Sequence, residues 1–329
     1  MEISMNVVNE GTIENQQVDY KAERKNFSKI GFRLFVSSII MQMIAPVIVG
    51  MFFPGWNTNT TLSTIVTMIS LFIIGYPIMI FLLKKIDAKA AGRLLEKKNM
   101  SILEIIKAFA MGYGILVAGN MIGLAITAII GLIKGGAVVN PFAEMAMGVD
   151  NIALLAVYTV ILAPIFEEIV FRKMLIDRTI KYGEGIAIVF SGVTFALFHG
   201  NFNQFIYALP MGMFLAFIYV KTANVKYTII LHMAVNFVGS ILGNLLMRVF
   251  DSTTTLGAAV INVYSIVVLV IAAVGVFLFI FCRKKLKLNA LNKEISLEKG
   301  KRFKTVAFNL GMILYSVFFI ILMVALLFV

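Results

Sequence analysis

Long apolar stretches separated by short polar segments dominate the chain. Nine of them reach or approach the roughly 18 residues that a membrane-spanning helix needs. Because lipid offers no partner to backbone polar groups, such stretches are expected to be helical. The pattern therefore predicts an all-α polytopic membrane protein with about nine transmembrane helices, at residues 27–53, 62–83, 102–133, 151–171, 186–199, 204–220, 227–247, 258–282 and 305–329.

The fifth and sixth stretches, 186–199 and 204–220, are the least certain crossings. Only residues 200–204 separate them, which leaves a very short turn. The two stretches could instead form a re-entrant pair, which a bilayer permits only where protein shields the irregular backbone from lipid. Either arrangement leaves the flanking loops on the same sides of the membrane.

The distribution of basic residues predicts the orientation. Lys and Arg gather in four segments, 84–98, 172–181, 221–226 and 283–304, whereas the intervening loops contain only Lys134 and Arg248. Cytoplasmic loops carry the excess of Lys and Arg in membrane proteins. We therefore expect a cytoplasmic N-terminus and an external C-terminus. This asymmetry also accounts for the net charge of +12 without a nucleic-acid partner.

The chain divides into four regions by composition. A polar cytoplasmic tail comes first, followed by transmembrane helices, a central region with polar groups in apolar segments, and further transmembrane helices. The basic segment 283–304 in the last region is expected to lie along the anionic cytoplasmic leaflet. Glycines in the third stretch, Gly112, Gly114, Gly119 and Gly123, predict close helix packing. The regions are 1–26, 27–150, 151–248 and 249–329.

Three ionisable residues lie where apolar residues are expected. Glu167, Glu168 and Arg172 stand at the predicted cytoplasmic end of the apolar segment 152–170. A charged side chain inside a bilayer is costly, so it usually faces a protein interior or cavity and has a partner. Glu168 and Arg172 are four residues apart, a spacing that lets side chains on one helix face pair. Glu167 is then the carboxylate whose partner must come from elsewhere.

The two histidines of the chain both lie in the central region. His199 ends the sequence F-A-L-F-H, and His232 stands four residues before Asn236 in H-M-A-V-N, on the same helix face. A carboxylate and an imidazole that converge on one water can act as a general base. An imidazole N–H and an amide can donate to the oxyanion of a tetrahedral intermediate. The set predicts hydrolysis of an amide bond within the membrane.

The three motifs together resemble the CAAX prenyl protease and bacteriocin-processing family, also called the Abi family. E-E-I-V-F-R matches its EExxxR motif, F-A-L-F-H its FxxxH motif and H-M-A-V-N its HxxxN motif, all within 151–248. The resemblance implies that Glu167 and His199 activate the attacking water. It further implies that His232 and Asn236 form the oxyanion hole and that Glu168 and Arg172 support the site.

A metal site is the alternative chemistry for the same residues. Glu167, His199 and His232 make a two-histidine, one-carboxylate set that could hold zinc with water in the open position. Asn236 is a poor zinc ligand and a good oxyanion donor, and the chain lacks an H-E-x-x-H helix. We therefore favour chemistry without a cofactor, with zinc as the alternative. The single cysteine, Cys282, leaves no cysteine-based cluster.

We interpret the protein as an intramembrane endopeptidase, and the resemblance implies that it belongs to a bacterial cell membrane. Its site is expected to open toward the cytoplasmic leaflet. Its partner would be a membrane-associated peptide or lipid-anchored protein in the bilayer, including bacteriocin precursors. A non-catalytic immunity or regulatory protein that binds through the same cavity is the alternative, and a proton-coupled transporter is a third.

The expected depths of the site residues in the membrane do not agree. Glu167 and His232 are expected to be shallow, whereas His199 lies about 20 Å along its segment.

Overall fold

The structure is a computed structural model that describes residues 18–138, 140–289 and 293–328. Most of the predicted polar tail, 1–26, lies outside the described residues. The last part of that tail does not behave as a tail, because a helix begins at Tyr20 with the Asp19 side chain capping its first turn. Within the described ranges the protein is helical throughout and forms no strand, as predicted.

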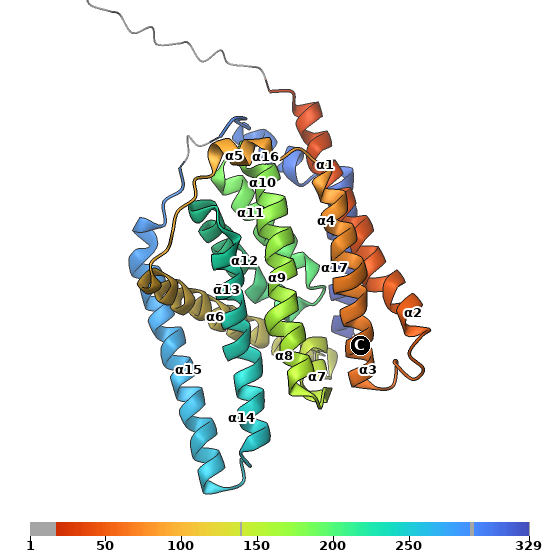
Figure 1. The fold of residues 1–329 in the computed structure, drawn as a ribbon, viewed down its shortest axis with the longest axis vertical. Helices are drawn as coiled ribbons and strands as arrows, with labels where there is room; N and C mark the ends of the chain where they lie inside the picture. The colour runs from red at the N-terminus through yellow and green to blue at the C-terminus, as the bar shows by residue number, and fades with distance from the viewer. Residues whose placement is uncertain (1–17, 139, 290–292, 329) are drawn as a thin grey trace, which may run out of the picture.

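Eight of the described helices are long and apolar enough to cross a membrane, and four of them are built from two or three shorter helices joined end to end (Figure 1). Their spans, with the component helices, are Tyr20–Gly50 (α1, Tyr20–Ile39; α2, Ala45–Gly50), Thr60–Lys84 (α3, Thr60–Met68; α4, Tyr76–Lys84), Ile102–Lys134 (α6), Ile152–Tyr182 (α8, Ile152–Ala156; α9, Ala163–Glu167; α10, Leu175–Thr179), Phe202–Thr222 (α12), Val225–Val249 (α13, Val225–Asn236; α14, Gly243–Val249), Thr255–Cys282 (α15) and Leu310–Phe328 (α17).

The predicted fifth crossing is the exception. Its helix, α11 (Glu184–Phe198), has only 15 residues. At 1.5 Å per residue it is about 22 Å long, less than the roughly 30 Å of a bilayer core. It packs along α12 as a helical hairpin, with the turn at Gly200 in a left-handed conformation, φ 65°. The remaining helices, α5 (Lys89–Leu94), α7 (Pro141–Gly148) and α16 (Lys299–Val306), are short and lie at the ends of the bundle.

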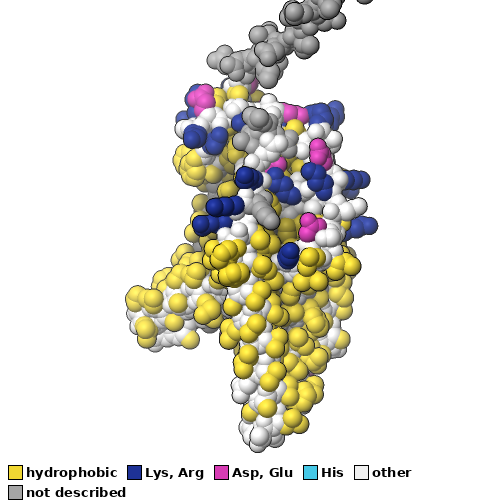
Figure 2. All heavy atoms as spheres, turned by 90° about the vertical axis from the view of Figure 1, so that its left-hand side faces the viewer, with side chains coloured by type: hydrophobic (Ala, Val, Ile, Leu, Met, Phe, Trp, Pro, Cys, Tyr) yellow, Lys and Arg dark blue, Asp and Glu magenta, His cyan; other side chains and the backbone are white. Residues whose placement is uncertain are grey.

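The basic loops meet at one end of the bundle, which we call the basic end. Arg93 pairs with Glu294 at 2.7 Å, the backbone N–H of Glu294 donates to the Lys181 carbonyl, and Lys221 pairs with Glu184 at 2.6 Å. Figure 2 shows Lys and Arg side chains across the upper part of the molecule and an apolar surface below them. Such a separation fits a membrane protein whose upper part is in water. The segment 283–304 folds onto this end, while its predicted contact with lipid stays a prediction.

Close contacts between helices occur at the glycines predicted for packing. A Cβ on Gly114 would lie 2.7 Å from the Ala272 carbonyl oxygen of α15, and one on Gly119 would lie 2.8 Å from Tyr207 of α12. Both distances are too short for a real side chain. The long helix α6 therefore holds α12 and α15 at backbone contact distance, and the glycine pattern predicted this correctly.

The helix Ile152–Tyr182, which we call the fourth spanning helix, is longer than predicted. We expected it to end near residue 171, with Arg172 starting a polar loop. It continues because the polar residues beyond that point have partners on other helices: the Tyr219 hydroxyl donates to Asp177 at 2.7 Å, and Arg178 donates to the Leu83 carbonyl at 2.8 Å. Glu167 consequently lies midway along this helix instead of near its end.

Candidate active site

The two adjacent carboxylates of the fourth spanning helix have different surroundings. Glu168 is fully buried, and its Oε2 lies 2.9 Å from Nε of Arg172, which is also fully buried. This is the ion pair that the spacing predicted. The side chain of Glu167 is 13% exposed and faces a cavity. The structure therefore divides the pair into one enclosed carboxylate and one accessible carboxylate.

Arg172 is held on several sides at once. Its guanidinium lies over the ring of Phe195 at 4.5 Å, and one of its terminal nitrogens donates to the Ser191 hydroxyl at 3.3 Å. Ser191 in turn donates to the Phe171 carbonyl at 2.6 Å. Because Ser191 and Phe195 belong to α11, these contacts fasten α11 to the fourth spanning helix next to the carboxylates.

His232 of α13 lies between the two carboxylates. Its Nδ1 is 3.0 Å from Oε1 of Glu168, and its Nε2 is 3.8 Å from Oε2 of Glu167. The ion pair with Arg172 keeps Glu168 an acceptor, so the hydrogen in the Nδ1 contact belongs to the imidazole. The other ring nitrogen, Nε2, is then the atom of His232 that faces Glu167 and the cavity.

His199 follows the last residue of α11 and lies on the other side of Phe195. Its Nδ1 is 2.9 Å from the Phe195 carbonyl oxygen, which can only accept, so Nδ1 carries the hydrogen. In the neutral ring Nε2 is therefore free to accept a proton. The Phe195 ring contacts both imidazoles edge to face, with centroid distances of 4.8 Å to His199 and 5.9 Å to His232. Both histidines therefore meet at one phenylalanine.

Asn236 has a partner that the sequence analysis did not foresee. Its Nδ2 donates to the backbone carbonyl of Thr159 at 2.8 Å. That carbonyl lies in a π-helical turn, where its donor would be the N–H five residues later, at Pro164. Proline has no N–H, so the carbonyl is left unpaired within its own helix. Asn236 satisfies it with one amide hydrogen and keeps a second hydrogen for the cavity that it lines.

A cavity of about 900 Å³ joins these residues. Glu167, His199, His232 and Asn236 all line it, and Glu167 is the only Asp, Glu, Lys or Arg among its described lining residues. Neutral amide and phenol groups supply most of its remaining polarity. Its size is within the roughly 300–1,000 Å³ of typical ligand sites. The further polar lining residues are Gln42, Thr67, Tyr76, Asn120, Asn140, Tyr158, Thr159, Asn201, Gln204, Tyr207 and Ser240.

The cavity occupies the half of the bundle away from the basic end. Among the described residues, its lining comes no closer to the basic end than Glu167 on the fourth spanning helix, His232 on α13 and Phe195 on α11. On α4 and α12 the lining residues nearest the basic end are Tyr76 and Met211. We expected the site to open toward the cytoplasmic leaflet, where the basic loops lie. That expectation was wrong, because tightly packed side chains fill the half on that side.

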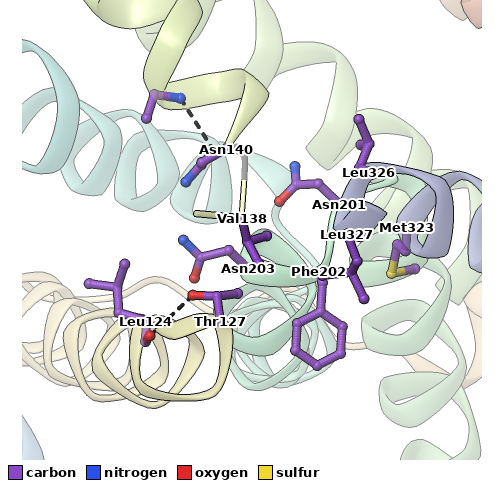
Figure 3. A pocket seen from close by; sticks show the side chains of 11 residues that line it. Leu124, Thr127, Val138, Asn140, Asn201, Phe202, Asn203, Met323, Leu326 and Leu327 are labelled. Carbon is purple, nitrogen blue, oxygen red and sulfur yellow. Dashed lines mark hydrogen bonds between the residues drawn. The ribbon is translucent and has the colours of Figure 1, made fainter. Parts of the chain in front are cut away.

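A smaller pocket of about 190 Å³ adjoins the cavity at the turn between α11 and α12. Figure 3 shows the amide side chains of Asn140, Asn201 and Asn203 around it. Asn140 and Asn201 line both spaces, so the pocket is a side chamber of the cavity. Asn203 is 7% exposed, and its Oδ1 has no hydrogen-bond partner. The chamber therefore offers amide groups to a ligand in the cavity.

Residues 149–238 match the family described as type II CAAX prenyl endopeptidase Rce1-like. This match covers all three motifs. Residues 149–238 are thus similar to an Rce1-like domain. No significant match was found among curated proteins or among solved structures. With its apolar helices, the protein is an integral membrane protein.

Helices outside the Rce1-like domain complete the cavity. Tyr76 of α4 is 1% exposed, stacks on Phe166 and interacts through its hydroxyl with the Glu167 carboxyl. Gln42 of the first spanning helix donates to the Phe198 carbonyl at 3.3 Å, at the end of α11. The sequence analysis missed both residues, since a lone tyrosine or glutamine in an apolar stretch carries no motif. The domain alone thus does not enclose the site.

Glu167, His199 and His232 were also considered as zinc ligands. In the described part of the chain, no three His, Cys, Asp or Glu side chains are arranged to hold a metal ion. The hydrogen bonds of the two histidines nevertheless suit zinc binding. Each histidine uses Nδ1 to donate to a carbonyl or carboxylate and leaves Nε2 toward the cavity.

Proposed function

We propose that the protein is an intramembrane endopeptidase that hydrolyses a peptide bond of a membrane-associated peptide with a water activated by Glu167 and His199. The observation that carries the proposal is that one cavity collects the accessible carboxylate, both imidazoles and an asparagine amide. The Rce1-like family is one of proteases, which supports the reaction class.

In this mechanism Glu167 and His199 hold the attacking water. His199 is oriented by the Phe195 carbonyl so that Nε2 accepts a proton. Glu167 is the only ionisable carboxyl group among the described lining residues, and it is enclosed by Tyr76 and His232. General acid–base catalysis of this kind contributes about 10²–10⁴-fold to a rate. The proton taken from water passes to the leaving amine as the tetrahedral intermediate collapses.

The oxyanion of that intermediate is stabilised by His232 and Asn236. In the imidazolium form His232 carries a hydrogen on both nitrogens, one directed at Glu168 and one at the cavity. Asn236 adds its second amide hydrogen. Glu168 and Arg172 are positioning residues, since they touch no cavity space and fix the His232 ring. Removing one oxyanion donor typically costs about 10²–10³-fold in kcat.

Zinc hydrolysis is the second candidate, favoured by the Nδ1 contacts of both histidines. In that version the metal would supply an activated water and polarise the carbonyl, with Glu167, His199 and His232 as its ligands. Metal analysis of the purified protein, and activity after chelation, separate the two. Activity that is lost on chelation and restored by zinc would replace the metal-free mechanism.

The test of the endopeptidase is cleavage of tagged, membrane-anchored peptides by purified protein in detergent. Glu167→Gln keeps the shape of the side chain and removes its charge, and Glu298→Gln is the matched control because Glu298 is exposed at the basic end. We expect cleavage by the wild type and by Glu298→Gln, and none by Glu167→Gln. Cleavage by all three would place the reaction elsewhere. Peptide binding without cleavage by any of them would favour the non-catalytic immunity or regulatory protein.

A further inference from the structure

The site is reached from the side of the molecule opposite its basic loops. Glu167, His232 and Phe195 mark the end of the cavity, and its other lining residues lie toward the loop between α2 and α3, the helix α7 and the end of α17. In Figure 1 these three elements lie together near the terminus marked C, away from α5 and α16. The open half of the bundle is therefore the half that carries almost no basic side chains.

The half of the bundle toward the basic end is closely packed beside the two carboxylates. On the fourth spanning helix Val170, Phe171, Leu175 and Ile176 are each 0% exposed, and they directly follow the two carboxylates. The ion pair of Glu168 and Arg172 fills the same layer and is fully buried. A peptide entering from the basic end would have to displace this packed layer and its ion pair.

The orientation follows from charge. Of the 29 Lys and Arg in the sequence, only Lys134 and Arg248 lie at the helix ends opposite the basic end. Both donate to backbone carbonyls there: Lys134 donates to Leu327 at 2.9 Å, and Arg248 to Val149 at 2.6 Å. Such strong asymmetry places the basic end in the cytoplasm. The mouth of the cavity then faces the extracytoplasmic side.

We propose that the substrate is an exported peptide, or the membrane anchor of an exported protein, which reaches Glu167 from the extracytoplasmic side. The inference rests on the proposed function for the reaction and on the cavity for the side. The lining also describes the substrate: with no Lys or Arg and one carboxylate among the described lining residues, it suits an uncharged, extended stretch. Asn140, Asn201 and Gln204 add amide side chains to this lining, and the last two are hydrogen-bonded to each other.

Cysteine labelling tests the side of access without requiring activity. Cys282 is the only cysteine, so Cys282→Ser gives a background free of thiols. Ser240 lines the cavity, Lys97 is exposed at the basic end, and Ser70 is 0% exposed on a helix that lines the cavity with other residues. Intact cells carrying Ser240→Cys, Lys97→Cys or Ser70→Cys are treated with a membrane-impermeant maleimide, before and after permeabilisation.

We expect Ser240→Cys to be labelled in intact cells, Lys97→Cys only after permeabilisation, and Ser70→Cys in neither case. Labelling of Lys97→Cys in intact cells would invert the orientation and overturn the inference. Labelling of Ser240→Cys only after permeabilisation would overturn it as well, because the cavity would then open to the cytoplasm.

Peptide cleavage in oriented vesicles separates this inference from the proposed function. A tagged, uncharged peptide with a lipid anchor is added to right-side-out or inside-out vesicles, and in parallel to detergent-solubilised protein. Cleavage by right-side-out vesicles, absent in Glu167→Gln, is expected. Cleavage in detergent and only by inside-out vesicles, or of a prenylated C-terminal peptide only there, would overturn the access side and keep the endopeptidase. Failure in detergent would remove the proposed function and, with it, the assignment of this substrate.

Discussion

The two halves of the bundle on either side of Glu167 are built differently. Toward the basic end most side chains of the fourth spanning helix are buried, and Glu168 and Arg172 are paired inside the protein. Away from it the same helix borders a cavity with Tyr158, Thr159 and Ala163. The comparison indicates that the packed half positions the reacting groups, whereas the hollow half provides the space for a substrate.

His199→Ala gives the largest expected effect, and it falls on catalysis alone. The imidazole projects into the hollow half, so its loss removes a base without opening the packed half. We expect peptide cleavage to fall by about 10²–10⁴-fold while the melting temperature in detergent stays close to that of the wild type. A variant that unfolds at much lower temperature would show that His199 belongs to the packed half.

Arg172→Met tests the packed half, where the main effect should be on stability. The substitution leaves the Glu168 carboxylate buried without its partner, which typically costs about 3–5 kcal/mol. Thermal or SDS unfolding in detergent would measure the loss. The double variant Glu168→Leu with Arg172→Met should recover much of it, because no buried charge remains. If the single and double variants are equally unstable, the pair is not what holds this layer.

The sequence predicted those features of the site that depend on neighbouring residues along one helix. The spacing of Glu168 and Arg172 determined their ion pair, and the glycines of α6 predicted its close contacts. The contact between His232 and Glu168 joins residues 64 positions apart, and no local pattern reports it. The length of the fourth spanning helix was misjudged for the same reason, since Arg178 is tolerated inside the protein only because the Leu83 carbonyl of another helix accepts from it.

Asn236→Ala should affect both catalysis and stability. It removes an oxyanion donor and leaves the Thr159 carbonyl without a partner, which costs about 1–3 kcal/mol for a buried polar group. Pro164→Ala is the matched partner, because it returns an N–H to the helix that contains this carbonyl. In a double-mutant cycle the loss of stability from Asn236→Ala should shrink in the Pro164→Ala background. Additive effects would mean that the proline does not create the need for the amide.

Two glycine substitutions give the smallest expected effects, with opposite signs. A Cβ on Gly123 would lie 2.4 Å from Oδ1 of Asn203, so Gly123→Ala must displace a buried amide of the side chamber and should cost about 1–3 kcal/mol. Gly92, in α5 at the basic end, has no heavy atom within 4 Å of such a Cβ. Gly92→Ala should therefore be neutral or stabilise the protein by up to about 1 kcal/mol, the difference in helix propensity. Equal melting temperatures for the two variants would mean that the side chamber accommodates a Cβ as easily as the surface does. The contacts with α6 would then not determine the structure of the hollow half.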